Sequence, residues 1–363
     1  MTTRRPLRVC LVGPSLDILG GQAVQAQRLL AGLSESEHLE VSFLPVNPRL
    51  PGPLRALQQI KYVRTVATSI AYIASLVSAV RRNDVIHAFS ASYWSYLLAP
   101  LPAMIIGRLM GRATVLNYRS GEASDHLGHW PRSVATMRRF ATAIAVPSGY
   151  LVKVFGEFGL AATSIANFVP IERLPYRRRD RLQPVFLSNR NLESLYNVQC
   201  TIRAFARVQR EFPDARLTIA GDGAERATLM ALVDQLGARN VSFIGRVGPD
   251  RMGELYDVAD IYLNSPNIDN MPGSIIEAFA CGIPVVSTNA GGIPFVVENG
   301  INGLLVPCND DEAMAAASLR LLRDPVFAQS LADAGRARCE ESYVWPAVRR
   351  QWEALYLSLA DAA

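Results

Sequence analysis

The residue types best suited to ligand chemistry lie in one stretch, DNMPGSIIEAFACG, which spans residues 269–282. Asp269 follows the apolar run IYLNS, and Glu277 falls inside a predicted helix eight positions further on. A loop carboxylate can accept hydrogen bonds from sugar hydroxyls, and a helical carboxylate can accept them from a ribose, as acids do in nucleotide sites. A loop acid and an exposed helical Glu would be the simpler interpretation. We favour ligand binding, because the run AFACGIPVV places Glu277 beside buried surface.

The helix that carries Glu277 is predicted to begin near 272–274. Its first backbone N–H groups, from Gly273 and Ser274, have no partner within the helix. Such groups can face a diphosphate, because a helix start favours anions. Together with the preceding Asn270 and Met271, they are predicted to line a site for a nucleoside-diphosphate sugar.

Three further motifs follow predicted strands. Arg190 comes just after the run VFLS, where a fixed guanidinium could bind a pyrophosphate. An arginine at this position could instead form a surface salt bridge. Gly20 and Gly21 precede a predicted helix and could let backbone N–H groups approach a phosphate; a structural turn explains them equally well. Gly221 and Asp222 form a tight turn that either contacts the ligand or serves only as a turn.

The elements around these motifs are short apolar strands separated by helices. Strands rich in Val, Ile and Leu indicate parallel sheets covered on both faces. Two successive sets predict two Rossmann-like, doubly wound α/β domains facing a cleft, with ligands beyond the carboxyl ends of the strands. The predicted strands are 8–12, 41–45, 85–88, 113–117 and 143–146, then 185–188, 216–220, 241–244, 261–264, 285–287 and 304–306.

The domain boundary is predicted near 168–184, where prolines flank a basic run that is typical of a linker. The first domain would then be 1–170 and the second 171–345. The last helix, within 346–363, carries apolar residues at helical spacing and could pack back on the first domain.

The composition is that of a globular chain. It has 363 residues, of which 50% are hydrophobic and 19% charged, enough for two cores. Five scattered cysteines without a CxxC pair predict neither disulfides nor a zinc site, and they fit a reducing cytoplasm. The longest apolar stretches, 65–80 and 93–106, are interrupted by Thr, Ser or Pro, so no transmembrane helix is predicted.

The net charge of +5 is uneven along the chain. Residues 1–170 hold 17 Lys and Arg against 8 Asp and Glu, whereas residues 171–363 hold 20 against 24. A basic first half suggests a phosphate-bearing substrate or a membrane surface, with surplus surface arginine as the alternative. The stretch 55–82 could lie on a membrane and receive a lipid-linked acceptor, or be an ordinary amphipathic helix. No nucleic-acid-binding motif is visible.

From 185 to 306 the order of segments resembles that of the retaining glycosyltransferases of family 4, which have the GT-B fold. The matching segments are RNLESLYN, IRAF, IAGDGAER, VSFIGRV, ADIYLNSP, EAFACGIPVVSTNAGG and NGINGLLV. The N-terminal Gly-Gly loop and DVIHAFS extend the resemblance over nearly the whole chain. It implies an enzyme that transfers a sugar from a nucleoside-diphosphate sugar, with retention of anomeric configuration and no required metal.

The resemblance also assigns roles on the donor side. It implies that Asp269 contacts the sugar, Glu277 the ribose and Arg190 the pyrophosphate. Gly20–Gly21 would form the phosphate-side loop, and backbone groups near Val247 would hold the base.

Two departures from the family pattern affect the donor side. The first acid is Asp269 rather than Glu, one methylene shorter. The Lys that usually follows the Arg is absent: Tyr196 stands near its place, with Asn197 where the family has Gly. One cation fewer therefore faces the diphosphate, and sugar preference could differ.

A third departure affects the acceptor side. The histidine often found near the donor sugar is missing, and Arg119 stands at the corresponding place. His87 remains, but Phe89 replaces a second histidine. We expect His87, Arg119 and the nearby Glu122 on the acceptor side.

These observations predict a hexosyl- or N-acetylhexosaminyltransferase of polysaccharide or glycolipid biosynthesis. It would act in the cytoplasm or at the inner membrane face, on a glycan, lipid-linked or small-molecule acceptor, without a metal or other cofactor. A non-catalytic sugar-nucleotide-binding protein is one alternative, which the missing Lys and His favour. A GT-B-fold epimerase is another. A phosphorylase would need a cofactor lysine, and residues 171–363 contain no lysine.

Overall fold

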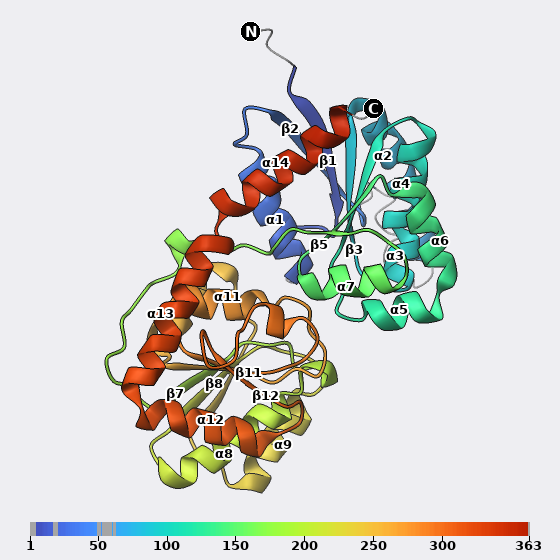
Figure 1. Cartoon of the computed structure of the whole chain (residues 1–363). Helices are drawn as coiled ribbons and strands as arrows, with labels where there is room; N and C mark the ends of the chain where they lie inside the picture. Colours follow the sequence, from blue (N-terminus) through green and yellow to red (C-terminus); the bar gives the residue numbers. More distant parts are fainter. Residues whose placement is uncertain (1–4, 17–20, 49–51, 53–59, 61–62, 362–363) are drawn as a thin grey trace. The chain divides into compact units, whose positions relative to one another are not determined.

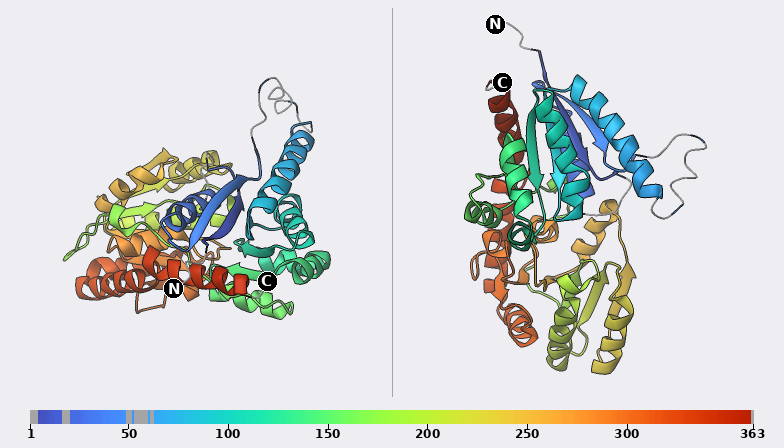
Figure 2. Two further views of the ribbon diagram at one scale, coloured as in Figure 1. Left: turned by 90° about the horizontal axis from the view of Figure 1, so that it is seen from above. Right: turned by 90° about the vertical axis from the view of Figure 1, so that its right-hand side faces the viewer.

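The computed structural model describes residues 5–16, 21–48, 52, 60 and 63–361 (Figure 1). The chain forms two compact units. Unit 1 comprises residues 1–166 and 348–363, and unit 2 comprises residues 167–347. Each unit contains one six-stranded sheet whose neighbouring strands are all parallel, with helices packed against it (Figure 2).

The sheet of unit 1 has the strand order β2-β1-β3-β4-β5-β6, so the order reverses between β1 and β3. Its strands are β1 (Leu7–Gly13), β2 (Leu39–Pro45), β3 (Val85–Ser90), β4 (Ala113–Tyr118), β5 (Ala143–Val146) and β6 (Thr163–Ser164). Its helices are α1 (Gly21–Leu33), α2 (Val63–Arg82), α3 (Trp94–Leu98), α4 (Pro100–Leu109), α5 (Ala123–His129), α6 (Pro131–Phe140), α7 (Gly149–Glu157) and most of α14 (Trp345–Asp361).

Alternation along β3 shows how that sheet is covered on both faces. Ile86 and Ala88 pack in a cluster with residues of α2 and α4. Their neighbours His87 and Phe89 stack on each other, and His87 also contacts Trp352 of α14. Successive side chains of a strand point to opposite faces, so α2 and α4 cover one face and α14 lies on the other.

The sheet of unit 2 has the order β12-β11-β10-β7-β8-β9, which reverses between β7 and β10. Its strands are β7 (Val185–Ser188), β8 (Arg216–Ala220), β9 (Val241–Gly245), β10 (Ile261–Asn264), β11 (Val285–Thr288) and β12 (Leu304–Val306). Its helices are α8 (Val198–Glu211), α9 (Arg226–Leu236), α10 (Met252–Val258), α11 (Gly273–Ala280), α12 (Asp311–Arg323) and α13 (Pro325–Ser342), with short 3-10 turns η2 (Ile171–Arg173), η3 (Ser194–Tyr196), η4 (Pro249–Arg251) and η5 (Ile293–Phe295).

The predicted doubly wound architecture is confirmed. All eleven predicted strands are present, each within two residues of its expected ends. The central strands β3 and β4 are buried along their whole length, and most of their residues are apolar. Strand β6 was not predicted, because it consists of two exposed polar residues at the sheet edge. Contrary to our prediction, one of the described helices, α2, is long and apolar enough to cross a membrane by length and composition.

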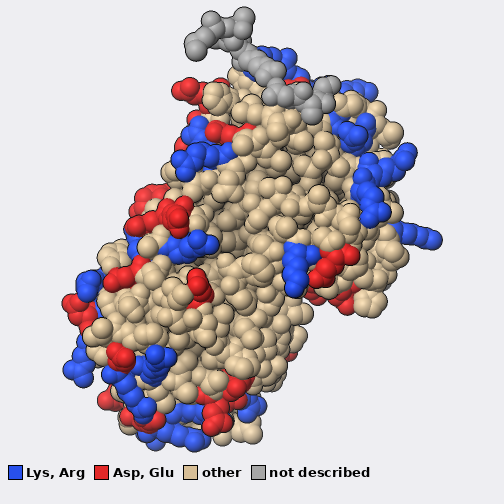
Figure 3. Space-filling model, viewed as in Figure 1, with Lys and Arg blue, Asp and Glu red and all other residues tan. Residues whose placement is uncertain are grey.

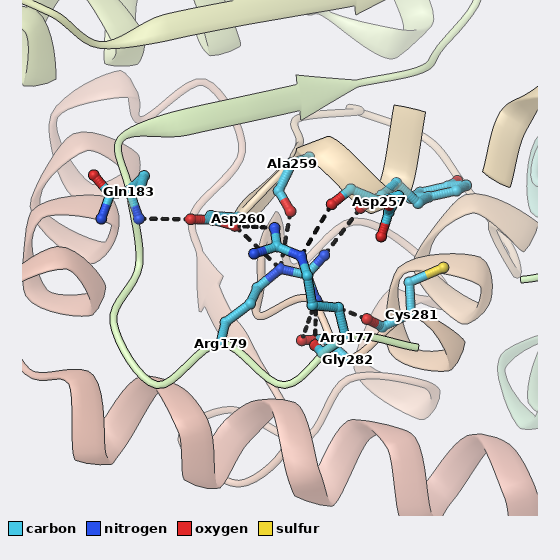
Figure 4. Close-up of polar contacts among 9 residues, drawn as sticks. Arg177, Arg179, Gln183, Asp257, Ala259, Asp260, Cys281 and Gly282 are labelled. Atoms are coloured by element: carbon cyan, nitrogen blue, oxygen red, sulfur yellow. Dashed lines mark hydrogen bonds and ion pairs between the residues drawn. The ribbon is translucent and has the colours of Figure 1, made fainter. Parts of the chain in front are cut away.

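The basic run within the segment predicted as a linker is anchored inside unit 2. Arg179 is buried and donates hydrogen bonds to the carbonyl oxygens of Tyr256 (3.0 Å), Ala259 (2.9 Å) and Cys281 (2.8 Å), as Figure 4 shows. Arg179 and Arg177 both pair with the carboxylate of Asp260. The basic run therefore ties the end of α10 to the end of α11, since it satisfies carbonyl groups at both.

Candidate functional site

Two of the predicted residues meet where the strand order of unit 2 reverses. Arg190 follows β7, and the loop after the adjacent β10 carries Asp269. Such a reversal opens a crevice for ligands at the carboxyl ends of parallel strands. The Nη2 atom of Arg190 donates to Oδ2 of Asp269 at 2.5 Å, and each side chain is only 12% exposed. The structure thus places a largely buried ion pair at the expected position.

The guanidinium of Arg190 is held from several sides. Its Nη1 donates to the hydroxyl of Ser274 at 3.3 Å, and its Cζ lies 4.2 Å from the ring centre of Tyr196. Burial opposes the charged form, but the carboxylate of Asp269 and nearby tyrosines outweigh it, so the pKa of Arg190 is raised. Within the described part of the chain, its buried Nε has no hydrogen-bond partner. A ligand oxygen could accept from that atom.

Glu277 lies on α11 and is oriented by a buried tyrosine. The hydroxyl of Tyr256 donates to Oε2 of Glu277 at 3.0 Å and lies 3.3 Å from the carbonyl oxygen of Ser274. The amide of Asn189, next to Arg190 in the chain, donates to the same hydroxyl at 2.8 Å. Burial, then the charge of Glu277, raises the pKa of Tyr256 well above its usual value, so it stays a phenol and a donor. The carboxylate is thereby held by Tyr256, whose hydroxyl also accepts from the residue next to Arg190.

Tyr256 and Asn189 belong to the site but were not among the predicted site residues. Asn189 stands beside Arg190 at the end of β7, a position that could have drawn attention to it. Tyr256 lies in a short helix with no motif around it, and its pattern indicates burial alone. Only the folded structure shows that it reaches Glu277.

The glycines of unit 2 hold the loops that carry the charged residues. A Cβ at Gly221 would overlap the carbonyl oxygen of Arg190, and a Cβ at Gly292 would overlap that of Asn270. Leu192, two residues after Arg190, donates from its N–H to the carbonyl of Asp222 at 3.1 Å. The predicted Gly221–Asp222 turn therefore has a structural role: it packs backbone against backbone and sets the position of the Arg190 loop.

The start of α11 brings together the other predicted donor-site residues. The N–H of Asn270 donates to Oδ1 of Asp269 at 2.7 Å, and the carbonyl of the buried Met271 accepts from the amide of Asn167 at 2.8 Å. The helix begins at Gly273, and no side chain caps it. Its first N–H groups are therefore available to an anion, next to Arg190.

Two predictions from the family resemblance concern the edge of this site. Asn197, expected where the family has Gly, has the left-handed backbone (φ 46°, ψ 45°) that favours Gly or Asn. Its amide is anchored by Asn309 at 2.9 Å. Val247 lies half-buried in the loop after β9. Among the described residues, no hydrogen bond joins it to Arg190, Asp269 or Glu277.

In unit 1 the predicted phosphate loop is only partly described. Gly20 lies outside the described residues, while Gly21 begins α1 with open space beside its Cα. The next residue, Gln22, donates to the carbonyl of Ser90 at 3.3 Å, and the N–H of Arg119 donates to the same oxygen at 3.0 Å. The start of α1 and Arg119 therefore lie together at the reversal between β1 and β3.

The predicted acceptor residue His87 is a core residue, which corrects that expectation. It is fully buried, with Nδ1 2.6 Å from the hydroxyl of Tyr356 and Nε2 2.9 Å from the amide of Asn117. Because the amide donates to Nε2, the proton sits on Nδ1. Burial, then the charge of Arg119, lowers the pKa of His87 to about 3, so the ring is neutral.

The other two predicted acceptor residues lie at the carboxyl end of β4. Arg119 donates to the amide oxygen of Asn117 at 3.3 Å, and burial lowers its pKa to about 10, which leaves it charged at neutral pH. Glu122 is exposed and precedes α5. No group of three or more His, Cys, Asp or Glu that could hold a metal is found among the residues that the structure describes.

Comparison with known proteins finds a family match over the part of the chain that carries this site. Residues 177–338 match the family described as glycosyl transferases group 1. N-acetyl-α-D-glucosaminyl L-malate synthase of Bacillus anthracis is 30% identical over 46% of this chain and 43% of its own length. A GDP-mannose-dependent monoacylated α-(1-6)-phosphatidylinositol monomannoside mannosyltransferase of Corynebacterium glutamicum is 29% identical over 58% of this chain and 56% of its own length. The chain spans about half the length of these relatives.

The fold is shared over nearly the whole chain with solved structures. The Anabaena protein HepE, crystallised with UDP-glucose, has a TM-score of 0.77 and 18% identity, over 97% of this chain and 100% of that one. The predicted GT-B fold is confirmed by this likeness and by the two parallel sheets.

Proposed function

We propose that this chain, whose residues 177–338 belong to the glycosyl transferases group 1, transfers a sugar from a nucleoside-diphosphate sugar to an acceptor hydroxyl. The observation that carries the proposal is the convergence of Arg190, Asp269 and Glu277 at the strand reversal of unit 2. A buried cation, two carboxylates and an open helix start are what a sugar nucleotide requires.

Each group then has a part of the donor to bind. The guanidinium of Arg190 and the N–H groups at the start of α11 take the charge of the diphosphate. Glu277, fixed by Tyr256, accepts from the ribose hydroxyls, and Asp269 accepts from the sugar. Relatives named for N-acetylglucosaminyl and GDP-mannose substrates support a hexosyl or N-acetylhexosaminyl donor. When the diphosphate binds, it competes with Asp269 for Arg190.

The reaction we propose retains the anomeric configuration and needs no metal. The bond between the anomeric carbon and the phosphate oxygen breaks, and the acceptor oxygen attacks the same face of that carbon. The acceptor proton passes to the departing phosphate oxygen, so no strong protein base is required. Arg190 and the α11 start would stabilise the leaving charge, which is usually the largest catalytic contribution.

For the acceptor we propose contacts from unit 1. Arg119 and Glu122 supply a charged donor and an acceptor at the carboxyl end of β4. A glycan, a lipid-linked sugar or a small hydroxyl compound would be suitable. The name of the mannosyltransferase relative, which includes a phosphatidylinositol mannoside, supports the lipid-linked class.

Two observations favour a rival, a protein that binds a sugar nucleotide without turnover. Arg190 and Asp269 are paired with each other, with Nη2 of the arginine 2.5 Å from Oδ2 of the carboxylate. Tyr196, which lies against Arg190, stands where the family has a second cation. Under that reading the donor binds tightly and no nucleoside diphosphate is released.

The test begins with thermal-shift measurements against UDP-, GDP- and ADP-sugars, followed by release of nucleoside diphosphate from the best binder. We expect one donor class to raise Tm and to turn over. Arg190→Ala should abolish release, while the matched variant Arg338→Ala, on the exposed side of α13, should not change it. No stabilisation by any donor would refute the proposal, and stabilisation without release would favour the rival. Product analysis by NMR then decides retention.

A further inference from the structure

A row of buried hydrogen bonds runs through unit 1 from the C-terminal helix to Arg119. The hydroxyl of Tyr356, on α14, lies 2.6 Å from Nδ1 of His87, and Nε2 of that ring lies 2.9 Å from the amide nitrogen of Asn117. The amide oxygen of Asn117 accepts from Nη1 of Arg119 at 3.3 Å. The first three residues are at most 1% exposed. We call these four residues the Arg119 network.

The guanidinium at one end fixes the direction of every bond in the network. A guanidinium has donors only, so the amide oxygen of Asn117 faces Arg119 and its NH₂ group faces His87. Nε2 of His87 is therefore an acceptor, and the ring proton on Nδ1 is donated to Tyr356. A proton on Nε2 would turn the amide of Asn117 over and take its oxygen away from Arg119.

Packing supports Arg119 from the same side of the sheet. Phe89, which is the neighbour of Asn117 in the register of β3 and β4, stacks on His87 with ring centres 4.9 Å apart. The Cζ atom of Arg119 lies 5.7 Å from the centre of the Phe89 ring, within the range of cation–π attraction. His87 also contacts Trp352 of α14, with ring centres 4.8 Å apart. Through His87, a helix at the other end of the chain thus supports Arg119.

We propose that Asn117 is the positioning residue for Arg119, and that His87 and Tyr356 determine which way its amide faces. The guanidinium is thereby held in one direction at the carboxyl end of β4. A side chain that is already held loses less conformational entropy on binding, so the network favours binding of an acceptor by Arg119. The role of Arg119 in acceptor binding rests on the proposed function, and on that basis α14 becomes part of the acceptor site.

Two measurements on the full chain test the network without donor or acceptor. The ¹⁵N spectrum of the four histidines at neutral pH should show a protonated Nδ1 and an unprotonated Nε2 for His87, assigned with His87→Gln. Phenylglyoxal, which modifies accessible guanidinium groups, should label Arg119 roughly tenfold faster in Asn117→Leu than in the parent, as expected for the loss of one hydrogen bond to a charged group. Figure 3 shows many other Lys and Arg side chains on the surface, so mass spectrometry of the peptides must locate the label.

Two further variants separate the direction of the bonds from packing alone. A carboxylate at position 117 accepts from Arg119 but cannot donate to His87. Asn117→Asp should therefore keep Arg119 as slowly labelled as in the parent and put a proton on Nε2 of His87. Tyr356→Phe keeps the ring but removes the acceptor of the Nδ1 proton. It should speed the labelling of Arg119 by a factor of roughly 2 to 10, the loss of one neutral hydrogen bond.

The matched control is Tyr96→Phe. Tyr96 is also fully buried in unit 1, but its hydroxyl bonds to Thr136, outside the Arg119 network. This variant should leave the labelling of Arg119 unchanged. If Asn117→Leu does not fold, Tyr356→Phe and Tyr96→Phe make the same comparison.

In the transfer reaction, folded Asn117→Leu should raise the KM for the best acceptor among a panel of methyl glycosides roughly tenfold and leave kcat nearly unchanged. A loss of folded protein would lower the apparent kcat instead. Its affinity for the nucleoside diphosphate should stay that of the parent, because Arg190 and Glu277 lie in unit 2.

Three results would overturn the proposal: a proton on Nε2 of His87 in the parent, equal labelling of Arg119 in the parent and folded Asn117→Leu, or an unchanged acceptor KM in that variant. If the parent releases no nucleoside diphosphate at all, the proposed sugar transfer fails. The labelling and the ¹⁵N spectrum then still decide whether Asn117 positions Arg119.

Discussion

Replacing Gly221 with Ala should remove most of the proposed sugar-transfer activity, although Gly221 has no reactive group. The added Cβ would overlap the carbonyl oxygen of Arg190, so the turn after β8 and the loop after β7 must separate. A displacement of about 1 Å in a residue that positions a substrate can cost roughly 100-fold in rate. We therefore expect kcat/KM to fall by roughly 100-fold, with an overpacking cost of about 1–3 kcal/mol in the free energy of unfolding.

The assay is nucleoside-diphosphate release from the best donor, measured beside thermal unfolding to confirm that the variant is folded. Gly156→Ala is the matched control, since nothing lies within 4 Å of its added Cβ and it is on an exposed part of α7. It should leave release unchanged and stabilise the chain by roughly 0.5–1 kcal/mol, because Ala is favoured over Gly inside a helix.

A folded Gly221→Ala chain with the turnover of the parent would refute this reasoning. It would mean either that the Arg190 loop is not held by the turn, or that its position does not matter to the reaction. A variant that unfolds entirely is distinguished by its melting curve, and donor binding by the Gly156→Ala chain then sets the reference.

Three other predictions follow from single contacts. Tyr256→Phe should weaken binding of the nucleoside diphosphate roughly 10- to 100-fold, because a hydrogen bond to the charged Glu277 contributes about 1.5–3 kcal/mol; calorimetric titration measures it, and unchanged affinity would count against the role of Tyr256. Arg179→Met should lower the free energy of unfolding by roughly 3–5 kcal/mol, because it removes a buried partner of Asp260; denaturant unfolding with no change in midpoint would contradict this. Below pH 6.5 the stability of the chain should fall as the pH is lowered. Burial lowers the pKa of His87 to about 3 and that of His126 to about 4 in the folded chain, so the unfolded chain takes up protons first. A Tm that stays level from neutral pH down to about 5 would exclude this effect.

The sequence predicted the strands well because buried parallel strands are continuous apolar runs, and their carboxyl ends then located Arg190 and Asp269. It failed where a side chain's partner lies far away in the chain. The position of His87 in β3 is compatible with either an exposed or a buried side chain. It is buried because α14, more than 250 residues later in the chain, packs against it. Likewise, the basic run containing Arg179 has the composition of a linker, but Arg179 is buried and bonded to Asp260, about 80 residues later in the chain.

The Arg190 loop shows a second kind of failure, in which the motif was found but its role was not. Gly221 was predicted as part of a ligand turn or as a bare turn, and neither interpretation foresaw that it packs on the Arg190 backbone. The reason is that a glycine's function depends on what approaches it, which a local pattern does not contain.

The most direct test of the donor site is calorimetric titration of the parent chain and Glu277→Gln with UDP, GDP and ADP. Gln keeps the acceptor for Tyr256 but removes the charge that accepts from the ribose. We predict that the parent binds one of these nucleoside diphosphates and that Glu277→Gln binds it roughly tenfold more weakly, since charge-assisted hydrogen bonds are about twice as strong as neutral ones. Equal affinity in both chains, or no binding of any of the three by the parent, would contradict the account.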